Sequence, residues 1–381
     1  MKKILITALM LMTILIIFGC SKKNSTPAAP APANAPVPFQ AMAVSAGAFH
    51  SLVLNSNGTL WATGENAFGQ LGDGTTNTRN AFEQVMTGVS AISAGWYHDL
   101  VLDNSGTLWA AGYNTYGQLG NGTTTQEDSF VQVMTGVGAI SAGGFYSLAL
   151  DNNGTFWAAG YNSNGQLGDG TTTNTDTYVQ ITVMAGVSAI SAGGMHSLAL
   201  NNNGNLWAAG DGGNGQLGNG TPGEENSFVQ ITGTTGVTAI SAGEYHSLIL
   251  KSDGTLWAAG QNTYGQLGNG TTTQENSFVQ VLTGVSGISA GGLFHSLALK
   301  NDGSLWATGK NDDGQLGTGD NDNRNTFTEV LTGVKAIAGG GYHGLAIKTD
   351  GSLWATGFNG WGELGTGDND DRNAWTQIYQ Y

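Results

Sequence analysis

A Trp-Ala-[Ala/Thr]-Gly phrase occurs seven times in this chain, and the spacing of its copies constrains the fold more than any other feature. Its tryptophans are Trp61, Trp109, Trp157, Trp207, Trp257, Trp306 and Trp354. Successive copies lie 48, 48, 50, 50, 49 and 48 residues apart. Two units share NTYGQLGNGTTTQE and SFVQV around a single difference, Asp128 against Asn276. The chain is therefore built from seven copies of one duplicated unit.

Each unit has the pattern of antiparallel strands. In HSLALNNNGNLWAAG two apolar runs flank an Asn-Gly pair, which supplies the positive φ angles of a tight hairpin. A GQLG turn follows the tryptophan run, then a polar loop, then a fourth apolar phrase such as FVQVMTGVSAIS. No stretch shows helical periodicity. Strand-rich units of this length are typical of propeller blades, so we predict an all-β, seven-bladed propeller around a central channel.

The order of the phrases suggests how the ring closes. The phrase [FYW]-x-[QE]-[VI] begins at Phe82, Phe130, Tyr178, Phe228, Phe278, Phe327 and Trp375. It precedes a Ser-Ala-Gly-type phrase in six cases, whereas the first such phrase, at Ser45, has none before it. We therefore expect the C-terminal strand to pair in the N-terminal blade, which leaves no open sheet edge.

The N-terminus indicates export. Lys2 and Lys3 precede an apolar stretch that is short for a membrane span, and Gly19 then precedes the single cysteine, Cys20. This pattern resembles a bacterial lipoprotein signal peptide, and the alternative is an ordinary signal peptide with a chance cysteine. We assign residues 1–19 to the signal peptide, residues 20–40 to a lipidated Cys20 and an Ala/Pro-rich tether, and residues 41–381 to the propeller. The expected location is the membrane, facing the periplasm or the cell exterior.

Composition narrows the partners. The net charge of −15 repels a nucleic-acid backbone, so we expect no nucleic-acid partner. One cysteine cannot form an internal disulfide, so packing alone must hold the fold.

Four motifs in combination carry a family resemblance. They are G-x-x-H-S-L-A-L, D-G-x-L-W-A-x-G, N-x-x-G-Q-L-G and G-D-x-x-D/N-R-N. Over residues 41–381 the chain resembles the regulator of chromosome condensation repeat family. The resemblance implies a seven-bladed propeller and little about function. Members that act as guanine-nucleotide exchange factors carry an inserted wedge, for which the repeat intervals leave no room, so exchange activity is a weak alternative.

Most repeated residues have a structural interpretation. The histidine position holds His50, His98, Tyr146, His196, His246, His295 and His343. Equivalent positions around a ring lie too far apart to ligate one metal ion, and adjacent His and Ser side chains on a strand point to opposite faces. We interpret these residues, and the seven repeated tryptophans, as packing between blades. Sugar stacking is the alternative for the tryptophans.

One position favours recognition. The residues directly before the histidine position are Phe49, Tyr97, Phe145, Met195, Tyr245, Phe294 and Tyr342. They follow a turn, so we expect them to form an aromatic patch on one face of the disc, rimmed by Trp96, Glu244 and Leu293. Aromatic residues dominate protein-binding hot spots. The alternative is that the rings turn inward and cap the core.

We therefore predict a non-enzymatic, envelope-anchored propeller that displays one face to a protein partner, with inhibition of that partner as a variant. A carbohydrate-binding propeller, using an exposed tryptophan such as Trp361, is the alternative. We expect no catalytic residue, cofactor or metal, and a monomer. The acidic loops at residues 319–325 and 367–373 fit surface turns better than calcium sites, and calcium binding stays open.

Overall fold

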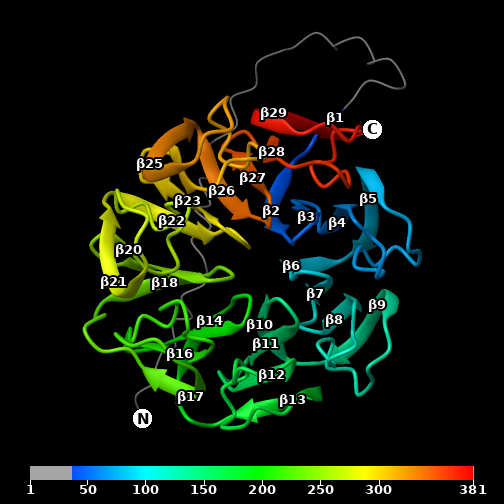
Figure 1. The fold of residues 1–381 in the computed structure, drawn as a ribbon. Helices are drawn as coiled ribbons and strands as arrows, with labels where there is room; N and C mark the ends of the chain where they lie inside the picture. The colour runs from blue at the N-terminus through cyan, green and yellow to red at the C-terminus, as the bar shows by residue number, and fades with distance from the viewer. Residues whose placement is uncertain (1–36, 381) are drawn as a thin grey trace, which may run out of the picture. The chain divides into compact units, whose positions relative to one another are not determined.

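The structure, a computed structural model, describes residues 37–380, whose regular secondary structure consists of β-strands. The strands form seven sheets arranged in a ring (Figure 1). Each sheet is a blade, and its four principal strands follow one another in the sequence. The predicted all-β, seven-bladed propeller is confirmed. Within the described range, no helix is long and apolar enough to cross a membrane. Cys20 and most of the tether lie outside the described residues.

The two inner strands of each blade carry the Ser-Ala-Gly and histidine phrases. The innermost strands are β2 (Ala41–Ala46), β6 (Val89–Ala94), β10 (Val137–Ala142), β14 (Val187–Ala192), β18 (Val237–Ala242), β22 (Val285–Ala290) and β26 (Val334–Gly339). The second strands are β3 (His50–Asn55), β7 (His98–Asp103), β11 (Tyr146–Asp151), β15 (His196–Asn201), β19 (His246–Lys251), β23 (His295–Lys300) and β27 (His343–Lys348).

The two outer strands carry the tryptophan phrase and the fourth apolar phrase. The third strands are β4 (Thr59–Gly64), β8 (Leu108–Gly112), β12 (Phe156–Gly160), β16 (Leu206–Gly210), β20 (Leu256–Gly260), β24 (Leu305–Gly309) and β28 (Leu353–Gly357). The outermost strands are β5 (Arg79–Thr87), β9 (Glu127–Met134), β13 (Thr175–Ile181), β17 (Glu225–Gln230), β21 (Glu275–Leu282), β25 (Arg324–Leu331) and β29 (Arg372–Gln380). We number the blades 1 to 7 from β2–β5 to β26–β29.

The second strand of each blade is buried on both faces because neighbouring blades cover it from either side. In blade 5 all of His246 to Leu250 is buried, and His246 pairs with Gly260 while Ile249 pairs with Trp257. A strand covered on both faces needs no alternation of polar and apolar residues. This explains the continuous apolar run after each histidine.

The GQLG turn of each blade holds the next blade. Gly268 has a φ of +73°, and a Cβ at this position would lie 2.5 Å from Cδ2 of Phe327 in the next blade. Only glycine both adopts this backbone conformation and leaves room for the ring. The equivalent contact joins blade 7 to blade 1, where Gly365 meets Phe82. The turns therefore link the blades into a closed ring.

The C-terminal strand joins the first and last strands of the propeller, but it does so in blade 7 and not in blade 1 as expected. β29 pairs with β28 and completes its own blade, and β1 (Val37–Pro38) adds to β29 as a fifth strand, with Val37 opposite Gln380. The expectation placed the boundary between repeats one strand too early. The fourth phrase pairs with the tryptophan strand that precedes it, so each sequence repeat is one whole blade.

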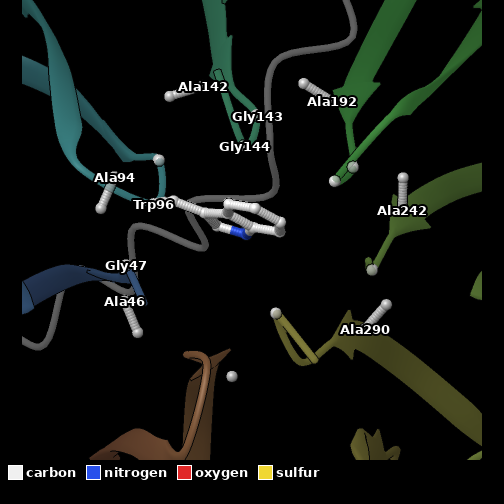
Figure 2. Close-up of a pocket in the computed structure, with 16 residues that line it drawn as sticks. Ala46, Gly47, Ala94, Trp96, Ala142, Gly143, Gly144, Ala192, Ala242 and Ala290 are labelled. Atoms are coloured by element: carbon white, nitrogen blue, oxygen red, sulfur yellow. The ribbon is translucent and has the colours of Figure 1, made fainter. Parts of the chain in front are cut away.

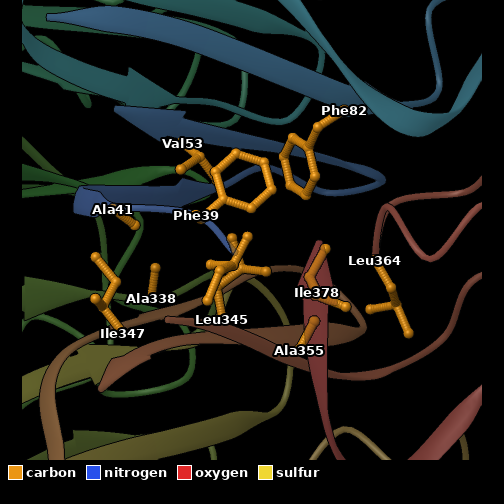
Figure 3. Packing of buried hydrophobic residues seen from close by; sticks show 11 residues of the cluster. Phe39, Ala41, Val53, Phe82, Ala338, Leu345, Ile347, Ala355, Leu364 and Ile378 are labelled. Carbon is orange, nitrogen blue, oxygen red and sulfur yellow. The ribbon is translucent and has the colours of Figure 1, made fainter. Parts of the chain in front are cut away.

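Phe39 seals the boundary between blade 7 and blade 1, which we call the seam. Its side chain is fully buried and makes edge contacts with Trp61 and Phe82, at ring-centroid distances of 6.0 Å and 5.2 Å. Figure 3 shows it in a cluster with Val53 from blade 1 and Leu345 from blade 7. The packed fold therefore includes residues that precede position 41.

Candidate functional site

The repeated histidines form hydrogen bonds across the blade boundaries. In five blades Nε2 of the histidine lies within hydrogen-bond distance of the residue that follows the histidine position in the next blade. The serine pairs are His98–Ser147 (2.9 Å), His196–Ser247 (2.8 Å), His246–Ser296 (2.9 Å) and His343–Ser51 (2.8 Å). In blade 1, His50 meets Asp99 at 2.8 Å. Sequence reasoning separated each histidine from its own serine correctly, but it missed the serine one repeat away.

The direction of these hydrogen bonds indicates a structural role for the histidine–serine pairs. The Ser247 hydroxyl donates to the backbone carbonyl of Gln216 at 2.7 Å, so it accepts from Nε2–H of His196. An activated nucleophile needs the opposite arrangement, in which the imidazole accepts the hydroxyl proton. Burial lowers the pKa of His196 and His246 to about 3, so both rings are neutral at physiological pH. The histidine–serine pairs hold blades together.

Two blade boundaries depart from this pattern. In blade 3 the Tyr146 hydroxyl donates to the carbonyl of His196 and accepts from the N–H of Gly193. In blade 6, Nε2 of His295 has no hydrogen-bond partner among residues 37–380, because Gly344 replaces the serine. A Cβ on Gly344 would lie 3.1 Å from Cη2 of Trp375, so the missing side chain makes room for the indole.

The seven repeated tryptophans lie between blades and are half-buried. Trp109 packs against the core of blade 1, and each of the others packs against the blade before its own. In blades 5 to 7 a lysine ammonium also covers the indole. These pairs are Lys251–Trp257 (3.9 Å), Lys300–Trp306 (3.8 Å) and Lys348–Trp354 (4.1 Å, all to the ring centroid). The ring faces that a sugar would stack on are therefore occupied in these three blades.

The residues before the histidine position form a ring of side chains at the mouth of the channel. All seven are half-buried, so they are neither hidden in the core nor fully free. Neighbours from adjacent blades contact one another face to face or at a tilt. The contacts are Phe49–Tyr342 (5.4 Å), Phe49–Tyr97 (6.4 Å), Tyr97–Phe145 (6.1 Å) and Tyr245–Phe294 (6.0 Å). Met195 interrupts the aromatic series in blade 4.

A second aromatic layer surrounds this ring and was missed by sequence reasoning. It comes from the loops between the third and outermost strands, which reach the same face of the disc. Its members are Phe68, Tyr113, Tyr116, Tyr161, Tyr264, Phe358 and Trp361. Five of them contact the first layer, as in Phe68–Tyr97 (5.4 Å), Tyr116–Phe145 (5.5 Å) and Tyr264–Phe294 (5.1 Å). We call the two layers together the aromatic face.

The second layer could have been found by alignment of the repeats. Its positions directly follow the Trp-Ala-[Ala/Thr]-Gly phrase or directly precede GQLG, which is GELG in blade 7. Blade 4 carries Asp211, Gly212, Gly213 and Asn214 here, so the aromatic contacts are densest from blade 7 through blade 3. Trp361 is 46% exposed and is the most open aromatic side chain of this face.

The centre of the face is narrow and lined by small residues. Fifteen alanines and glycines, from the innermost strands and the turns that follow them, line a cavity of about 110 Å³ together with Trp96. Figure 2 shows the Trp96 indole reaching across this opening from blade 2. Gly144 makes room for it, since a Cβ there would lie 3.3 Å from the indole. Leu293 of blade 6 is half-buried. We call this centre the hub.

Acidic groups outnumber basic groups around the face. Glu244 is buried beside the hub, and burial raises the pKa of its carboxyl to about 7. Burial also raises the pKa of Glu65. Lys310 stands between two rings of the face, 6.0 Å from the centroid of Tyr264 and 5.4 Å from that of Tyr342.

Each acidic surface loop contains an ion pair between an aspartate and the arginine at the end of the loop. Asp320 pairs with Arg324 at 2.6 Å, and Asp368 pairs with Arg372 at 2.7 Å. Within residues 37–380, no group of three or more His, Cys, Asp or Glu side chains is placed to hold a metal ion.

Fold and face together define a seven-bladed β-propeller of the kind that serves as a general protein-interaction scaffold. The chain belongs to the RCC1-like domain family, whose sequence model matches residues 131–379. Sequence models of the regulator of chromosome condensation (RCC1) repeat match residues 43–70, 89–118 and 105–150.

Solved structures share this fold at low sequence identity. Human WBSCR16 is 22% identical, with a TM-score of 0.75, over 84% of this chain and 93% of that chain. Prp20p from Saccharomyces cerevisiae, described with its binding to Gsp1p and histones, is 22% identical, with a TM-score of 0.76, over 86% and 87%. Yeast RCC1 (Prp20) bound to Kap60 is 20% identical, with a TM-score of 0.76, over 95% and 91%. No curated protein matches the chain in sequence.

Proposed function

We propose that this chain is a non-enzymatic, protein-binding propeller that is held at the cell envelope by a lipidated Cys20 and presents its aromatic face to a partner. The observation that carries the proposal is the two-layered aromatic face, in which aromatic residues from six blades lie around one channel mouth. Aromatic side chains with few rotatable bonds supply large contact areas at low entropic cost, and they dominate binding hot spots.

Mutual contacts prepare these rings for binding. Phe145 touches Trp96, Tyr97 and Tyr116 at centroid distances of 5.2, 6.1 and 5.5 Å. A ring held on several sides loses little freedom when a partner arrives, so more of the contact energy contributes to affinity. Its half-buried state leaves one surface for the partner.

A binding role also suits the histidine–serine pairs. The pairs resemble a catalytic dyad in composition, but their hydroxyls donate to backbone carbonyls, as Ser296 does to Gln266 at 2.7 Å. This polarity favours a structural role for the pairs.

The test of the binding face is recovery of envelope proteins on the immobilised soluble domain. The domain should begin no later than residue 37, because β1 and Phe39 belong to the fold. The variant is Tyr97→Ala/Tyr245→Ala, and the matched control is Met42→Ala, which removes a 46% exposed side chain from the opposite end of an innermost strand. We expect the double variant to lose a partner that wild type and control retain. Equal recovery by all three would contradict the proposal.

The anchor has a separate test. Replacement of Cys20 with serine should move the protein from the membrane fraction to the soluble fraction, because one thiol carries the proposed lipid. A Cys20→Ser protein that still sediments with membranes would remove the anchor from the proposal.

Carbohydrate binding is a second candidate, favoured by the exposure of Trp361. An exposed indole can stack on a sugar ring, whereas the lysine-covered tryptophans of blades 5 to 7 cannot do so without moving the lysine. Loss of oligosaccharide binding in Trp361→Ala, with the protein partner retained, would favour this candidate.

A further inference from the structure

One ionisable side chain borders the hub. Seven turns between the innermost and second strands converge there, and each contributes the residue two positions before the histidine position. These residues are Ala48, Trp96, Gly144, Gly194, Glu244, Leu293 and Gly341. Six of the seven are apolar, so Glu244 supplies the only charge at this level of the ring.

Glu244 is buried without a full set of hydrogen bonds. Its residue exposure is 5%, and its Oε2 has no hydrogen-bond partner among residues 37–380. The side chain folds over Gly194, where a Cβ would lie 2.7 Å from the Glu244 Cγ. A buried carboxylate oxygen without a partner is costly, and a cation that reaches it would offset the cost of its burial.

The charge of this carboxyl acts on several tyrosines of the aromatic face. Burial raises the pKa of Tyr97, and the negative charges of Glu65 and Glu244 raise it further. Glu244 also contributes to the raised pKa of Tyr342 and, after burial, to that of Tyr245. Its charge therefore acts on phenols from blades 2, 5 and 7, while the Trp96 indole lies across the hub (Figure 2).

The face already accommodates one cation of this chain. The Lys310 ammonium lies near the rings of Tyr264 and Tyr342, an arrangement that the negative face of an aromatic ring stabilises. Glu65, Asp211 and Asp313 occupy the same layer of the face as Lys310. Including Glu244, the acids number four against one lysine, so the face favours a positively charged partner.

We propose that the hub receives a lysine or arginine side chain of the partner protein, whose cation pairs with the Glu244 carboxylate and packs against Trp96 and the surrounding phenols. This inference rests on the proposed function, because it names the chemistry that the partner brings to the centre of the aromatic face. The aromatic face supplies the contact area, and the hub selects the residue at its centre.

The test uses short peptides in place of the whole partner. Acetyl-Gly-Lys-Gly-amide, its arginine counterpart and a neutral norleucine analogue are titrated into the soluble domain labelled with ¹⁵N at the tryptophans. The indole N–H signal of Trp96 is assigned by its loss in Trp96→Phe. We expect the lysine or arginine peptide to shift this signal in a saturable way, and the norleucine peptide to bind at least about tenfold more weakly.

Glu244→Gln separates charge from shape. The amide has nearly the same size and stays neutral, so the fold should persist, whereas affinity for the cationic peptide should fall by about tenfold to about a hundredfold. Asp313→Asn is the matched control, since it removes a peripheral acid of the same face and should change affinity little. An unchanged affinity in Glu244→Gln, equal binding of the norleucine peptide, or no shift with any peptide each overturns the inference.

Failure of the cation site can be distinguished from failure of the proposed binding face. If Glu244→Gln recovers the envelope partner as wild type does, while Tyr97→Ala/Tyr245→Ala loses it, the cation site is wrong and the binding face stands. If the double variant also recovers the partner, the binding face itself is wrong.

Discussion

His246 in blade 5 donates Nε2–H to the hydroxyl of Ser296 in blade 6, across 2.9 Å and one repeat of sequence. The same hydroxyl donates to the carbonyl of Gln266 at 2.7 Å. Gln266 belongs to the GQLG turn of blade 5, which packs against blade 6. One serine therefore joins a buried strand and a buried turn of the preceding blade to its own blade. The repeated histidines serve this connection.

Ser296→Ala should destabilise the fold by about 1–3 kcal/mol, because it leaves the imidazole N–H of His246 buried without an acceptor. Chemical denaturation of wild type and variant gives the difference in free energy of unfolding. A matched control is Ser286→Ala, which removes an exterior hydroxyl that bonds to the Leu299 carbonyl at 3.2 Å. If both substitutions lower the free energy of unfolding equally, the hydrogen bond between the blades contributes no more to stability than an exterior one.

The pair Gly344 and Trp375 predicts a coupled effect. Gly344→Ser alone should destabilise, because its Cβ would press on the Trp375 ring at 3.1 Å. Trp375→Phe restores the aromatic residue of most other blades and gives the new serine hydroxyl space. The hydroxyl can then donate to the Gln315 carbonyl, which lies 3.6 Å from the Cβ position, and accept from the unpartnered Nε2 of His295. A double-mutant cycle should show favourable coupling of about 0.5–3 kcal/mol. Additive effects would refute the compensation.

Glu363 predicts a pH-dependent stability. It occupies a position that holds glutamine in the other six blades, and burial raises the pKa of its carboxyl to about 8. Since an unfolded glutamate titrates near about 4.3, the folded state holds the proton longer, and stability falls as pH rises from about 4.3 to about 8.

Glu363→Gln should remove this loss and keep the acceptor for the N–H of Trp361, which Oε2 receives at 2.9 Å. We expect the variant to be more stable than wild type at pH 9, by on the order of 2–4 kcal/mol, and similar to it at pH 5. Thermal unfolding across this pH range measures the effect. A constant difference between the two proteins at all pH values would contradict the assignment.

Phe39→Ala should destabilise the protein by about 3–5 kcal/mol, because it opens a cavity between Trp61 and Phe82 at the seam. Deletion of residues 375–381, which removes most of the outermost strand of blade 7, should lower the melting temperature further. If either change leaves the unfolding curve in place, the seam does not depend on the chain ends.

The number of blades and the order of their strands could be predicted from the sequence because each repeat is one structural unit. The turn glycines and the apolar runs recur with it, so local chemistry and fold agree. Ring closure was less accessible, because β1 is only two residues long and no sequence pattern precedes Phe39. Hydrogen bonds between blades were also hidden, since spacing along the chain does not reveal which serine faces His246.

The candidate site was predicted in part. The positions before the histidines recur as Phe, Tyr or Met, so comparison of the repeats identified them. The second layer varies from blade to blade, with Glu65, Asp211 and Lys310 at positions where Tyr113 and Phe358 stand in other blades. Variation of this kind resembles an ordinary loop, and only the shared face in the ring shows that these residues adjoin the first layer.

Site-specific photo-crosslinking tests the binding face most directly. Benzoylphenylalanine replaces either Tyr116, in the second aromatic layer, or Met42, at the opposite end of an innermost strand, in the full chain expressed in its native cells. We predict that the protein with the crosslinker at position 116 forms a covalent adduct with a discrete partner protein and that the protein with the crosslinker at position 42 does not. Adducts from position 42 alone, or from neither position, would contradict the account.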